Sequence, residues 1–373
     1  MIKHLRIDGL NGRETLDLDM HPDVNVITGK NGSGKTNLLK LLWYIVSGNL
    51  ELLCEIPFDL VEVTTDQYFF GMKRLPHSGV GGAVDAKFAV ITSLPGITYG
   101  GHLRAREMAE YNEALKKANG ASLFLPTFRR IEGGFGLTGP LSDHARAGSA
   151  RLLLDQTIDS VGPLPRAMDD LATRLSSDGH QFIAAVSTRD LVRLISQRFA
   201  RVSQESDAIQ TDLARVIMQN ANGNSADSSP AAELGNIRRQ AAEITRRRDE
   251  LRRPFSVLGD LVATMLMHKG IHLGDSNSLG DAAAAIDSEA LSAGEKQMLS
   301  FLCYNAVLTN AVIFVDEPEI SLHVDWQRLL LPTLMEQNGT NQWIVATHSP
   351  FIYAKYADKE LPLGLPQVAL THA

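Results

Sequence analysis

The chain has 373 residues, of which 44% are hydrophobic and 21% are charged, and its formal net charge is −7. This length is enough for two or three domains with substantial cores. The negative charge argues against a uniformly basic nucleic-acid-binding protein, although a local basic surface remains compatible with it. The two cysteines, Cys54 and Cys303, are too few for a disulfide framework or a zinc site, and we expect both to be buried free thiols.

The N-terminal residues 1–7 alternate between apolar and polar side chains, which predicts a strand. They lack the apolar core of a signal peptide. No apolar run approaches the ~18 residues that are needed to span a bilayer. We therefore expect a soluble protein of the cytoplasm, with no membrane partner.

Residues 29–36 read Gly-Lys-Asn-Gly-Ser-Gly-Lys-Thr, which fits the phosphate-binding P-loop pattern G-x-x-x-x-G-K-[ST]. The pattern predicts a strand before the loop, over residues 24–27, and a helix after it, over residues 37–43. Glycines let backbone N–H groups close around phosphate oxygens, and the helix N-terminus attracts the same anion. The lysine adds charge for the β- and γ-phosphates, and the threonine hydroxyl can bind Mg²⁺. The expected nucleotide-binding residues are Asn31, Gly32, Ser33, Gly34, Lys35 and Thr36.

A second acidic motif follows much later in the chain. Residues 311–318 form an apolar run that ends in Asp316, Glu317 and a proline, which is typical of a buried parallel strand. A carboxylate at the end of such a strand can meet the Mg²⁺ held by the P-loop, and we assign this role to Asp316. Glu317 is placed to orient or deprotonate the attacking water. An acidic pair in a turn is more often only solvated, but the apolar run before this pair favours the functional interpretation.

Two further motifs flank this acidic strand. Residues 343–350 predict another buried strand with His348 at its end, after a helix expected over residues 325–336. The earlier segment, residues 291–297, reads Leu-Ser-Ala-Gly-Glu-Lys-Gln. There, the Ser292 hydroxyl and the backbone N–H groups around Gly294 and Glu295 form a candidate anion site at a helix N-terminus. By itself this segment is equally consistent with an ordinary helix cap.

The order of these motifs resembles the ABC-type ATPase head shared by SMC proteins and the OLD-like AAA ATPases. The resemblance covers residues 1–48 and 286–352. It implies an α/β P-loop NTPase fold with an antiparallel β-subdomain, and ATP and Mg²⁺ as cofactors of ATP hydrolysis. It also implies that His348 senses the γ-phosphate. In this family, Ser292 and Gly294 of one subunit would contact the ATP on the P-loop of another, in a head-to-tail homodimer.

One family motif, the Q-loop glutamine at a strand end of the first lobe, is not evident here. The candidates for this role are Gln67 and the segment of residues 123–130, which includes Arg129 and Arg130. That segment resembles a Pro-x-x-Arg-Arg stretch in related defence ATPases. Short apolar runs at residues 60–63, 88–91 and 122–125, separated by glycine-rich breaks, predict the antiparallel β-subdomain.

The region from 186 to 262 has a different periodicity. Apolar residues recur at steps of three and four over residues 192–216 and again over 234–251, with a polar segment between them. This pattern predicts two helices folded back on each other, a short antiparallel coiled-coil arm over residues 186–253. Helices of ~25 residues would project about 35–40 Å. Pro254 should end or kink the second helix.

The second helix of this arm is rich in arginine. These side chains could bind nucleic-acid phosphates, of DNA or RNA, or an acidic partner. They could also form a solvated face neutralised by neighbouring acidic residues such as Glu243 and Asp249, and we give that alternative more weight. The arginines in question are Arg238, Arg239, Arg246, Arg247, Arg252 and Arg253.

The sequence thus predicts an N-terminal ATPase lobe (1–140), a helical insertion (141–265) and a C-terminal ATPase lobe (266–373). About 25 residues follow His348, without the acidic cluster of a two-metal nuclease domain such as OLD nucleases carry. We expect an ATP-driven switch that controls a separate effector, a nuclease or toxin. The resemblance to ATPase subunits of anti-phage systems of the Septu, PARIS and retron types implies this role. A DNA-binding repair or chromosome ATPase is the alternative, and a membrane-transporter subunit fits poorly.

Overall fold

The computed structural model describes residues 1–12, 15–75, 88–94, 99–103, 105–127, 129–131, 163–186, 188–222, 230–267 and 292–364. It divides into two compact units. The first unit comprises Met1–Ser187, Leu308–Pro332 and Gly339–Ala373, and the second comprises Thr188–Val307 and Thr333–Asn338. The three-part division by ATPase lobes and insertion stays a prediction.

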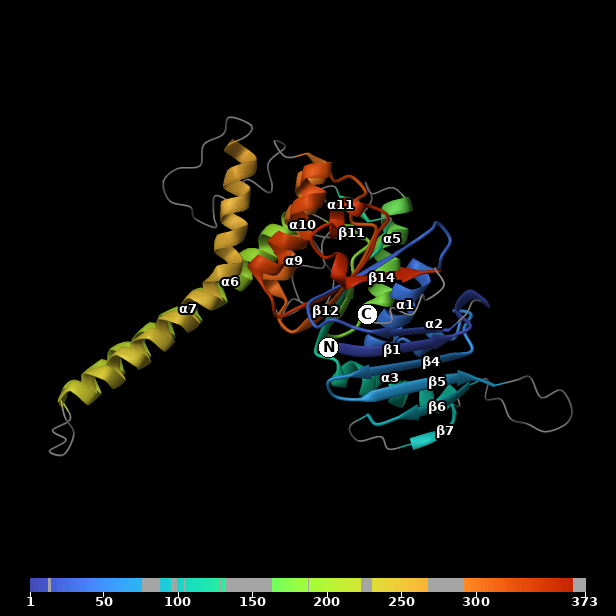
Figure 1. Ribbon diagram of the computed structural model, residues 1–373, viewed down its shortest axis with the longest axis horizontal. Coiled ribbons are helices and arrows are strands. Elements are labelled where there is room, and N and C mark those ends of the chain that lie inside the picture. The colour runs from blue at the N-terminus through green and yellow to red at the C-terminus, as the bar shows by residue number, and fades with distance from the viewer. Residues whose placement is uncertain are drawn as a thin grey trace, which may run out of the picture. The chain divides into compact units, whose positions relative to one another are not determined.

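A six-stranded parallel sheet forms the centre of the first unit (Figure 1), in the order β10-β8-β12-β13-β3-β14. Its strands are β10 (His180–Phe182), β8 (Ala121–Leu125), β12 (Ala311–Asp316), β13 (Gln342–Ala346), β3 (Val24–Gly29) and β14 (Glu360–Leu363). The three predicted apolar strands are therefore confirmed, as the adjacent strands β12, β13 and β3. Ala346 pairs with both Asp316 and Ile27, so these strands end level with one another. The P-loop, the acidic pair and His348 consequently follow the same edge of the sheet.

A second six-stranded sheet is antiparallel throughout, in the order β2-β1-β4-β5-β6-β7. Its strands are β1 (Ile2–Asp8), β2 (Leu16–Asp19), β4 (Leu60–Thr65), β5 (Phe69–Arg74), β6 (Phe88–Thr92) and β7 (Tyr99–Leu103). The predicted runs at 60–63 and 88–91 belong to it. The run at 122–125 does not, because it forms β8 of the parallel sheet, where Leu123, Phe124 and Leu125 are all buried. Burial on both faces explains why this run is continuously apolar.

The helix that follows the P-loop, α1 (Lys35–Val46), is buried on almost every side. Its apolar residues join one core with residues of both sheets. The ring of Trp43 lies 5.4 Å from that of Phe124 on β8 and 5.6 Å from that of Phe182 on β10. Such an enclosed helix has little freedom to move, so it holds its N-terminal loop in place. Smaller elements complete the unit: η1 (Leu10–Gly12), α2 (Leu50–Leu53), α3 (Ala105–Ala118), β9 (Arg130–Ile131), α5 (Pro163–Leu175), β11 (Ala185–Val186), α11 (Pro350–Tyr353) and η3 (Ala357–Lys359).

The second unit is helical. It contains α6 (Thr188–Asn222), α7 (Pro230–Met267), α9 (Ala293–Val307) and the end of α10 (Val324–Gln337), whose first part belongs to the other unit. Helices α6 and α7 pack on each other and on α9, and the rings of Phe199 and Phe255 meet edge to face at 5.5 Å. Long helices thus occupy both places predicted for the arm, while coiled-coil packing stays a prediction. The predicted turn includes residues 223–229, which lie outside the described residues.

Pro254 does not end the second helix, because α7 continues through it to Met267. Figure 1 draws α7 with a change of direction along its length, as expected where a proline removes a backbone hydrogen bond. The carbonyl oxygen of Pro254 accepts a hydrogen bond of 2.9 Å from the Gln337 side chain. A side chain of α10 therefore supports the helix at the proline.

Both cysteines are free thiols. Cys303 is buried in α9 as expected, and burial raises the pKa of its thiol. Cys54 is only half-buried, contrary to the expectation. Within the described parts of the chain, none of the helices has both the length and the apolar character that crossing a membrane requires.

Candidate nucleotide-binding site

The loop between β3 and α1 has a backbone that favours glycine at Gly29, Gly32 and Gly34, all of which have positive φ. Gly29 (φ 146°) and Gly34 (φ 97°) both lie in the left-handed region. A Cβ on Gly29 would stand 2.7 Å from the carbonyl oxygen of Leu363 and 2.8 Å from Oγ of Ser33, closer than such atoms can approach. Gly34 forms the N-cap of α1. Asn31 and Gly32 are exposed and Ser33 is buried. The loop is therefore shaped as an anion-binding turn at a helix N-terminus.

Lys35 lies inside this loop, with only 5% of its surface exposed. Its Nζ donates to the carbonyl oxygens of Gly29 (3.1 Å) and Lys30 (3.4 Å), and it lies 2.6 Å from Nε2 of His348. A lysine ammonium can only donate, so a charged Lys35 uses Nε2 of His348 as an acceptor. Burial lowers the pKa of Lys35, and Glu317, Asp316 and Glu319 partly oppose this effect. An incoming phosphate would add further negative charge close to this buried ammonium.

The Asp316 carboxylate is almost fully buried, at 1% exposure. Its Oδ2 accepts two hydrogen bonds, from Oγ1 of Thr36 (2.8 Å) and Oγ1 of Thr127 (2.6 Å). Its Oδ1 has no hydrogen-bond partner among the described residues. A buried carboxylate oxygen without a partner is costly, which indicates a place for a ligand. Carboxylate and hydroxyl oxygens suit Mg²⁺, so these residues fit the metal that the P-loop motif implies.

Glu317 has a backbone conformation that is rare for a residue with a side chain, with φ at 48°. Its N–H donates to the carbonyl oxygen of Ala346 (2.8 Å), and its Oε1 lies 3.8 Å from Nε2 of His348. Nearly a third of the side chain is exposed, so water can reach the carboxylate. Strained backbone of this kind concentrates at functional sites.

Glu319 fixes the turn that carries His348, a role that the sequence analysis missed. Its Oε1 accepts a hydrogen bond from the backbone N–H of His348 (2.7 Å), and its Oε2 accepts one from Oγ1 of Thr347 (2.8 Å). Both carboxylate oxygens are thus used to hold the end of β13. The acidic motif of residues 316–319 could have drawn attention to Glu319. Its partners, Thr347 and His348, lie in a distant segment, so the sequence alone does not indicate the contact.

The segment after β8 contacts the acidic pair through Arg129. Its Nη1 donates to the carbonyl oxygens of Asp316 (2.8 Å) and Pro126 (2.9 Å), and its Nη2 donates to that of Glu317 (3.2 Å). Burial lowers the pKa of Arg129 to about 10, against the opposing effect of Asp316, Glu319 and Glu317. Arg129 therefore supports the acidic strand end, and its predicted contact with phosphate stays a prediction.

The other Q-loop candidates are Gln67 and Arg130, and their role stays a prediction. Gln67 is exposed in the turn between β4 and β5 of the antiparallel sheet, where its N–H donates to Oγ1 of Thr65. It does not line the cavity at the P-loop. Arg130 lies on β9, whose backbone pairs with β11. Thr127, which lies within the candidate segment 123–130 but was not assigned a role, donates a hydrogen bond to the Asp316 carboxylate.

A cavity of about 460 Å³ opens beside the loop. Its lining includes Asn31 and Ser33 of the loop, His348, Tyr353 of α11 and Glu360 of β14. This volume lies within the range of small-ligand sites. The cavity gives a ligand access to one side of the P-loop.

The Leu-Ser-Ala-Gly-Glu segment is described in the second unit from Ser292 onward. Ser292 caps α9, and its N–H and its Oγ each donate to Oε2 of Glu295 at 2.7 Å. The N–H of Glu295 donates back to Oγ of Ser292 at 3.4 Å, which completes a capping box. Gly294 lies in the first turn of the helix. The contact of this segment with a nucleotide stays a prediction.

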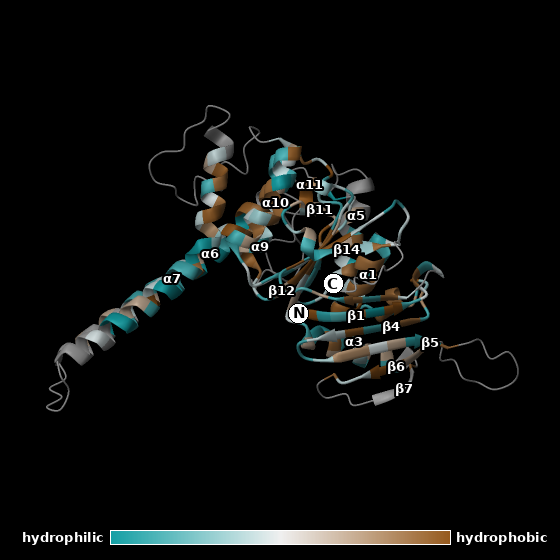
Figure 2. Ribbon diagram, in the orientation of Figure 1, coloured by the Kyte–Doolittle hydropathy of each residue, from teal (hydrophilic) through white to brown (hydrophobic). Residues whose placement is uncertain are grey.

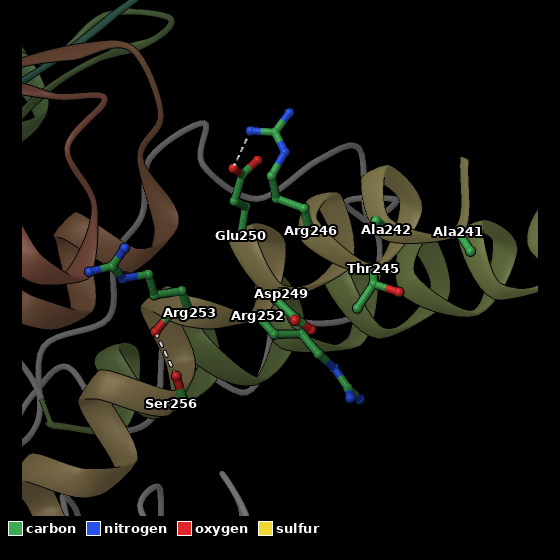
Figure 3. Close-up of a pocket in the computed structure, with 9 residues that line it drawn as sticks. All are labelled: Ala241, Ala242, Thr245, Arg246, Asp249, Glu250, Arg252, Arg253 and Ser256. Atoms are coloured by element: carbon green, nitrogen blue, oxygen red, sulfur yellow. Dashed lines mark hydrogen bonds and ion pairs between the residues drawn. The ribbon is translucent and has the colours of Figure 1, made fainter. Parts of the chain in front are cut away.

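The arginines singled out on α7 are all exposed. Figure 2 colours much of this helix as hydrophilic. Arg246 forms ion pairs with Glu243 (2.6 Å) and Glu250 (2.9 Å). Figure 3 shows an open groove on this face, where Arg252 and Arg253 point away from the Arg246–Glu250 pair. Neutralisation by acidic neighbours is thus visible at Arg246.

Together, the parallel sheet, the glycine-shaped loop and the buried Lys35 and Asp316 define a P-loop ATPase fold of the α/β class. A family model matches residues 24–121 and 165–354, and its description reads "AAA domain, putative AbiEii toxin, Type IV TA system". The match covers more than half of the chain, so this protein belongs to that family of AAA domains. The α/β P-loop fold class predicted from the sequence is confirmed.

Two curated relatives are similar over a short stretch. The DNA replication and repair protein RecF of Haemophilus ducreyi is 40% identical over 47 residues, and that of Lactobacillus acidophilus is 39% identical over 44 residues. These stretches cover 13% and 12% of this chain, and the same shares of the relatives. The chain therefore matches about an eighth of the length of these relatives.

Solved structures with a similar backbone trace include two Smc heads. One is the Smc head domain with an extended coiled coil bound to the C-terminal domain of ScpA, from Pyrococcus furiosus. It has 14% identity and a TM-score of 0.36. The other is the SmcHead bound to the C-winged helix domain of ScpA, with 13% identity and a TM-score of 0.37. Each comparison covers 95% of this chain and 91% of the other.

Proposed function

We propose that this protein binds ATP with Mg²⁺ at the P-loop, hydrolyses it, and uses the cycle as a switch. The observation that carries the proposal is the arrangement at one edge of the parallel sheet. There, Thr36 donates a hydrogen bond to Asp316, and His348 lies between Lys35 (2.6 Å) and Glu317 (3.8 Å). This arrangement combines a phosphate site, a carboxylate with one oxygen available, and a carboxylate open to water.

Phosphate binding is proposed to replace contacts that the loop makes with itself. Lys35 donates to the carbonyl oxygens of Gly29 and Lys30 in the loop. An ammonium that exchanges these neutral acceptors for anionic phosphate oxygens gains charge-assisted hydrogen bonds. The backbone N–H groups of the loop and the N-terminus of α1 add to the attraction. ATP rather than GTP is proposed on family resemblance alone.

The Thr36 hydroxyl and the Asp316 carboxylate are proposed to hold Mg²⁺. When bound, the metal supplies positive charge that neutralises the phosphates as the terminal one is transferred. The contribution of the chain is to keep Oδ1 of Asp316 available by engaging Oδ2 with hydroxyl donors.

Glu317 is proposed to orient the attacking water and to accept its proton, since its side chain is partly exposed at the end of β12. His348 is proposed to contact the γ-phosphate. Its backbone N–H donates a hydrogen bond to Glu319, which holds the turn that carries the ring. Glu317→Gln would keep the shape and remove the proton acceptor, so binding should persist while hydrolysis stops.

We further propose that two subunits share each ATP, with Ser292 and Gly294 of one subunit acting on the nucleotide of the other. The Ser292 hydroxyl and N–H are engaged with Glu295 of the same helix. A γ-phosphate at this helix N-terminus would compete with Glu295 for the same donors. The capping box would then act as the resting arrangement of a trans-acting site.

A complementation experiment tests this sharing. Lys35→Met and Ser292→Arg should each abolish ATP hydrolysis alone. Mixed in equal amounts, the two variants should regain roughly a quarter of the wild-type rate, because half of random dimers are mixed and each has one intact site. No recovery on mixing, with dimers shown to exchange, would remove the shared-site proposal.

The output of the switch is proposed to be control of a separate effector, a nuclease or toxin, in anti-phage defence. The family description, which names a toxin of a toxin–antitoxin system, supports an effector-linked role. Affinity capture from the native host, with the Glu317→Gln variant and with or without ATP, should recover one protein in a nucleotide-dependent manner. Capture of nothing that depends on ATP would count against a protein effector.

The alternative, a DNA-binding repair or chromosome ATPase, is favoured by one finding: the RecF relatives are DNA replication and repair proteins. The exposed Arg252 and Arg253 would be the phosphate contacts. Reversing the charge of both should abolish a salt-dependent affinity for DNA, whereas reversing Arg246, which is paired with acidic residues, should weaken it less. Absence of DNA binding at low salt, with and without ATP, would exclude this alternative.

A further inference from the structure

Thr127 reaches the acidic end of β12 because β8 and β12 are neighbours in the parallel sheet. The register pairs Leu125 with Val315, so the chain leaves both strands at the same level. Two residues beyond β8, Oγ1 of Thr127 donates a hydrogen bond of 2.6 Å to Oδ2 of Asp316. A residue outside the P-loop and the acidic motif thus contacts the carboxylate proposed to bind the metal.

The consequence concerns the orientation of that carboxylate. Rotation about the terminal torsion of an aspartate is only weakly restricted by its own covalent structure. Here Oδ2 is held from two directions, by Thr36 at 2.8 Å and by Thr127 at 2.6 Å, while Oδ1 is buried without a hydrogen-bond partner among the described residues. Two donors on one oxygen fix the plane of the group and leave the other oxygen available.

The two hydroxyls are expected to behave differently once Mg²⁺ is bound. The Thr36 hydroxyl belongs to the P-loop motif and is expected to turn toward Mg²⁺. Thr127 would then be the donor that still holds Oδ2. Without it, the carboxylate could rotate or approach the metal through either oxygen.

We propose that Thr127 is a positioning residue of the magnesium site, which orients Asp316 so that Oδ1 faces the metal. This inference rests on the proposed function, since it assumes a Mg²⁺–nucleotide complex at the P-loop. Partners of this kind, which hold a metal-binding carboxylate, commonly contribute about 10–100-fold to metal affinity.

The test measures nucleotide affinity with and without the metal. A fluorescent ATP analogue is titrated into the whole protein, once with EDTA and once at a series of Mg²⁺ concentrations. For Thr127→Val, affinity in EDTA should equal that of the wild type, while half-saturation by Mg²⁺ should need at least about tenfold more metal. Thr127→Ser, which keeps the hydroxyl, should restore the wild-type Mg²⁺ response.

Thr92→Val provides a matched control. Thr92 is a buried strand threonine whose hydroxyl donates to the carbonyl oxygen of Phe69 in the antiparallel sheet. The same hydroxyl accepts a hydrogen bond from the N–H of Leu94, and losing both contacts away from Asp316 should not change the Mg²⁺ response. If Thr127→Val fails to fold, Thr127→Cys against Thr127→Ser repeats the test, because a thiol is a much weaker donor than a hydroxyl.

The outcomes separate the inference from the proposed function. A wild-type Mg²⁺ response in Thr127→Val, or a response in Thr127→Ser as weak as that of the valine variant, would overturn the positioning role and leave nucleotide binding intact. A wild-type protein that binds no nucleotide in either condition would overturn the proposed function, and the inference with it.

Discussion

Nζ of Lys35 lies 2.6 Å from Nε2 of His348, although the two residues are 313 positions apart in the sequence. The parallel sheet causes this contact, because β3 and β13 are neighbours and end at the same edge. The histidine nitrogen is within hydrogen-bond distance of the lysine ammonium. Phosphate binding therefore has to reorganise this pair, which links the occupancy of the P-loop to the turn after β13.

Lys35→Met should abolish the stabilisation of the protein by ATP. Ligand at 100 times its dissociation constant stabilises a protein by about 2.7 kcal/mol, which is readily seen as a rise in Tm. The variant keeps the length of the side chain and removes its charge. Thermal unfolding with and without ATP checks this, and a full ATP-dependent rise in Tm of the variant would show that the nucleotide binds elsewhere.

The same variant should reveal the cost of burying the lysine charge. The pKa of Lys35 is lowered from its ordinary 10.5, mainly by burial, so the unfolded chain binds this proton more tightly than the folded one. The cost is full below the folded pKa and disappears as the pH rises toward 10.5. Without nucleotide, Lys35→Met should thus be more stable than the wild type near neutral pH, and this advantage should shrink at alkaline pH. Urea unfolding at neutral and at alkaline pH measures the difference in stability between the variant and the wild type. A stability advantage of the variant that grows with pH would contradict this prediction.

Arg129→Met should destabilise the fold, because two carbonyl oxygens at the end of β12 and one at Pro126 lose a buried cationic donor. The expected loss in the free energy of unfolding is about 3 kcal/mol, while Arg174→Ala, at an exposed position on α5, should change it by less than about 0.5 kcal/mol. Chemical unfolding compares the two. Equal effects would mean that Arg129 does not support the acidic strand end.

Glu319→Gln should reduce hydrolysis more than binding. An amide offers one acceptor oxygen where the carboxylate uses two, so the turn that carries His348 loses one of its two anchors. We expect kcat to fall at least about tenfold, since small displacements of catalytic groups are costly, with ATP affinity changed by less than about threefold. Steady-state kinetics and nucleotide titration measure these values. Glu336→Gln, on an exposed part of α10, is the control and should leave both unchanged.

Much of the site could be predicted because its signals are local. The glycine spacing of residues 29–36 and the apolar run that ends at Asp316 each specify their own strand and turn. The run at 122–125 was assigned to the wrong sheet, because a short apolar segment has the same sequence pattern in a parallel sheet as in an antiparallel one. Thr127 and Glu319 were missed for a related reason. Their roles depend on which strands are neighbours in the sheet, and the strand order cannot be predicted from a single sequence.

Dimerisation of Glu317→Gln is the most direct test of the central claim, that the P-loop edge of the sheet binds ATP and couples it to assembly. The variant lacks the proton acceptor for water, so ATP should remain bound and hold two subunits together. Light scattering with Mg²⁺ should give twice the monomer mass with ATP, and the monomer mass without it or when Lys35→Met is added to the variant. A Glu317→Gln protein that binds ATP and keeps the monomer mass would contradict the account.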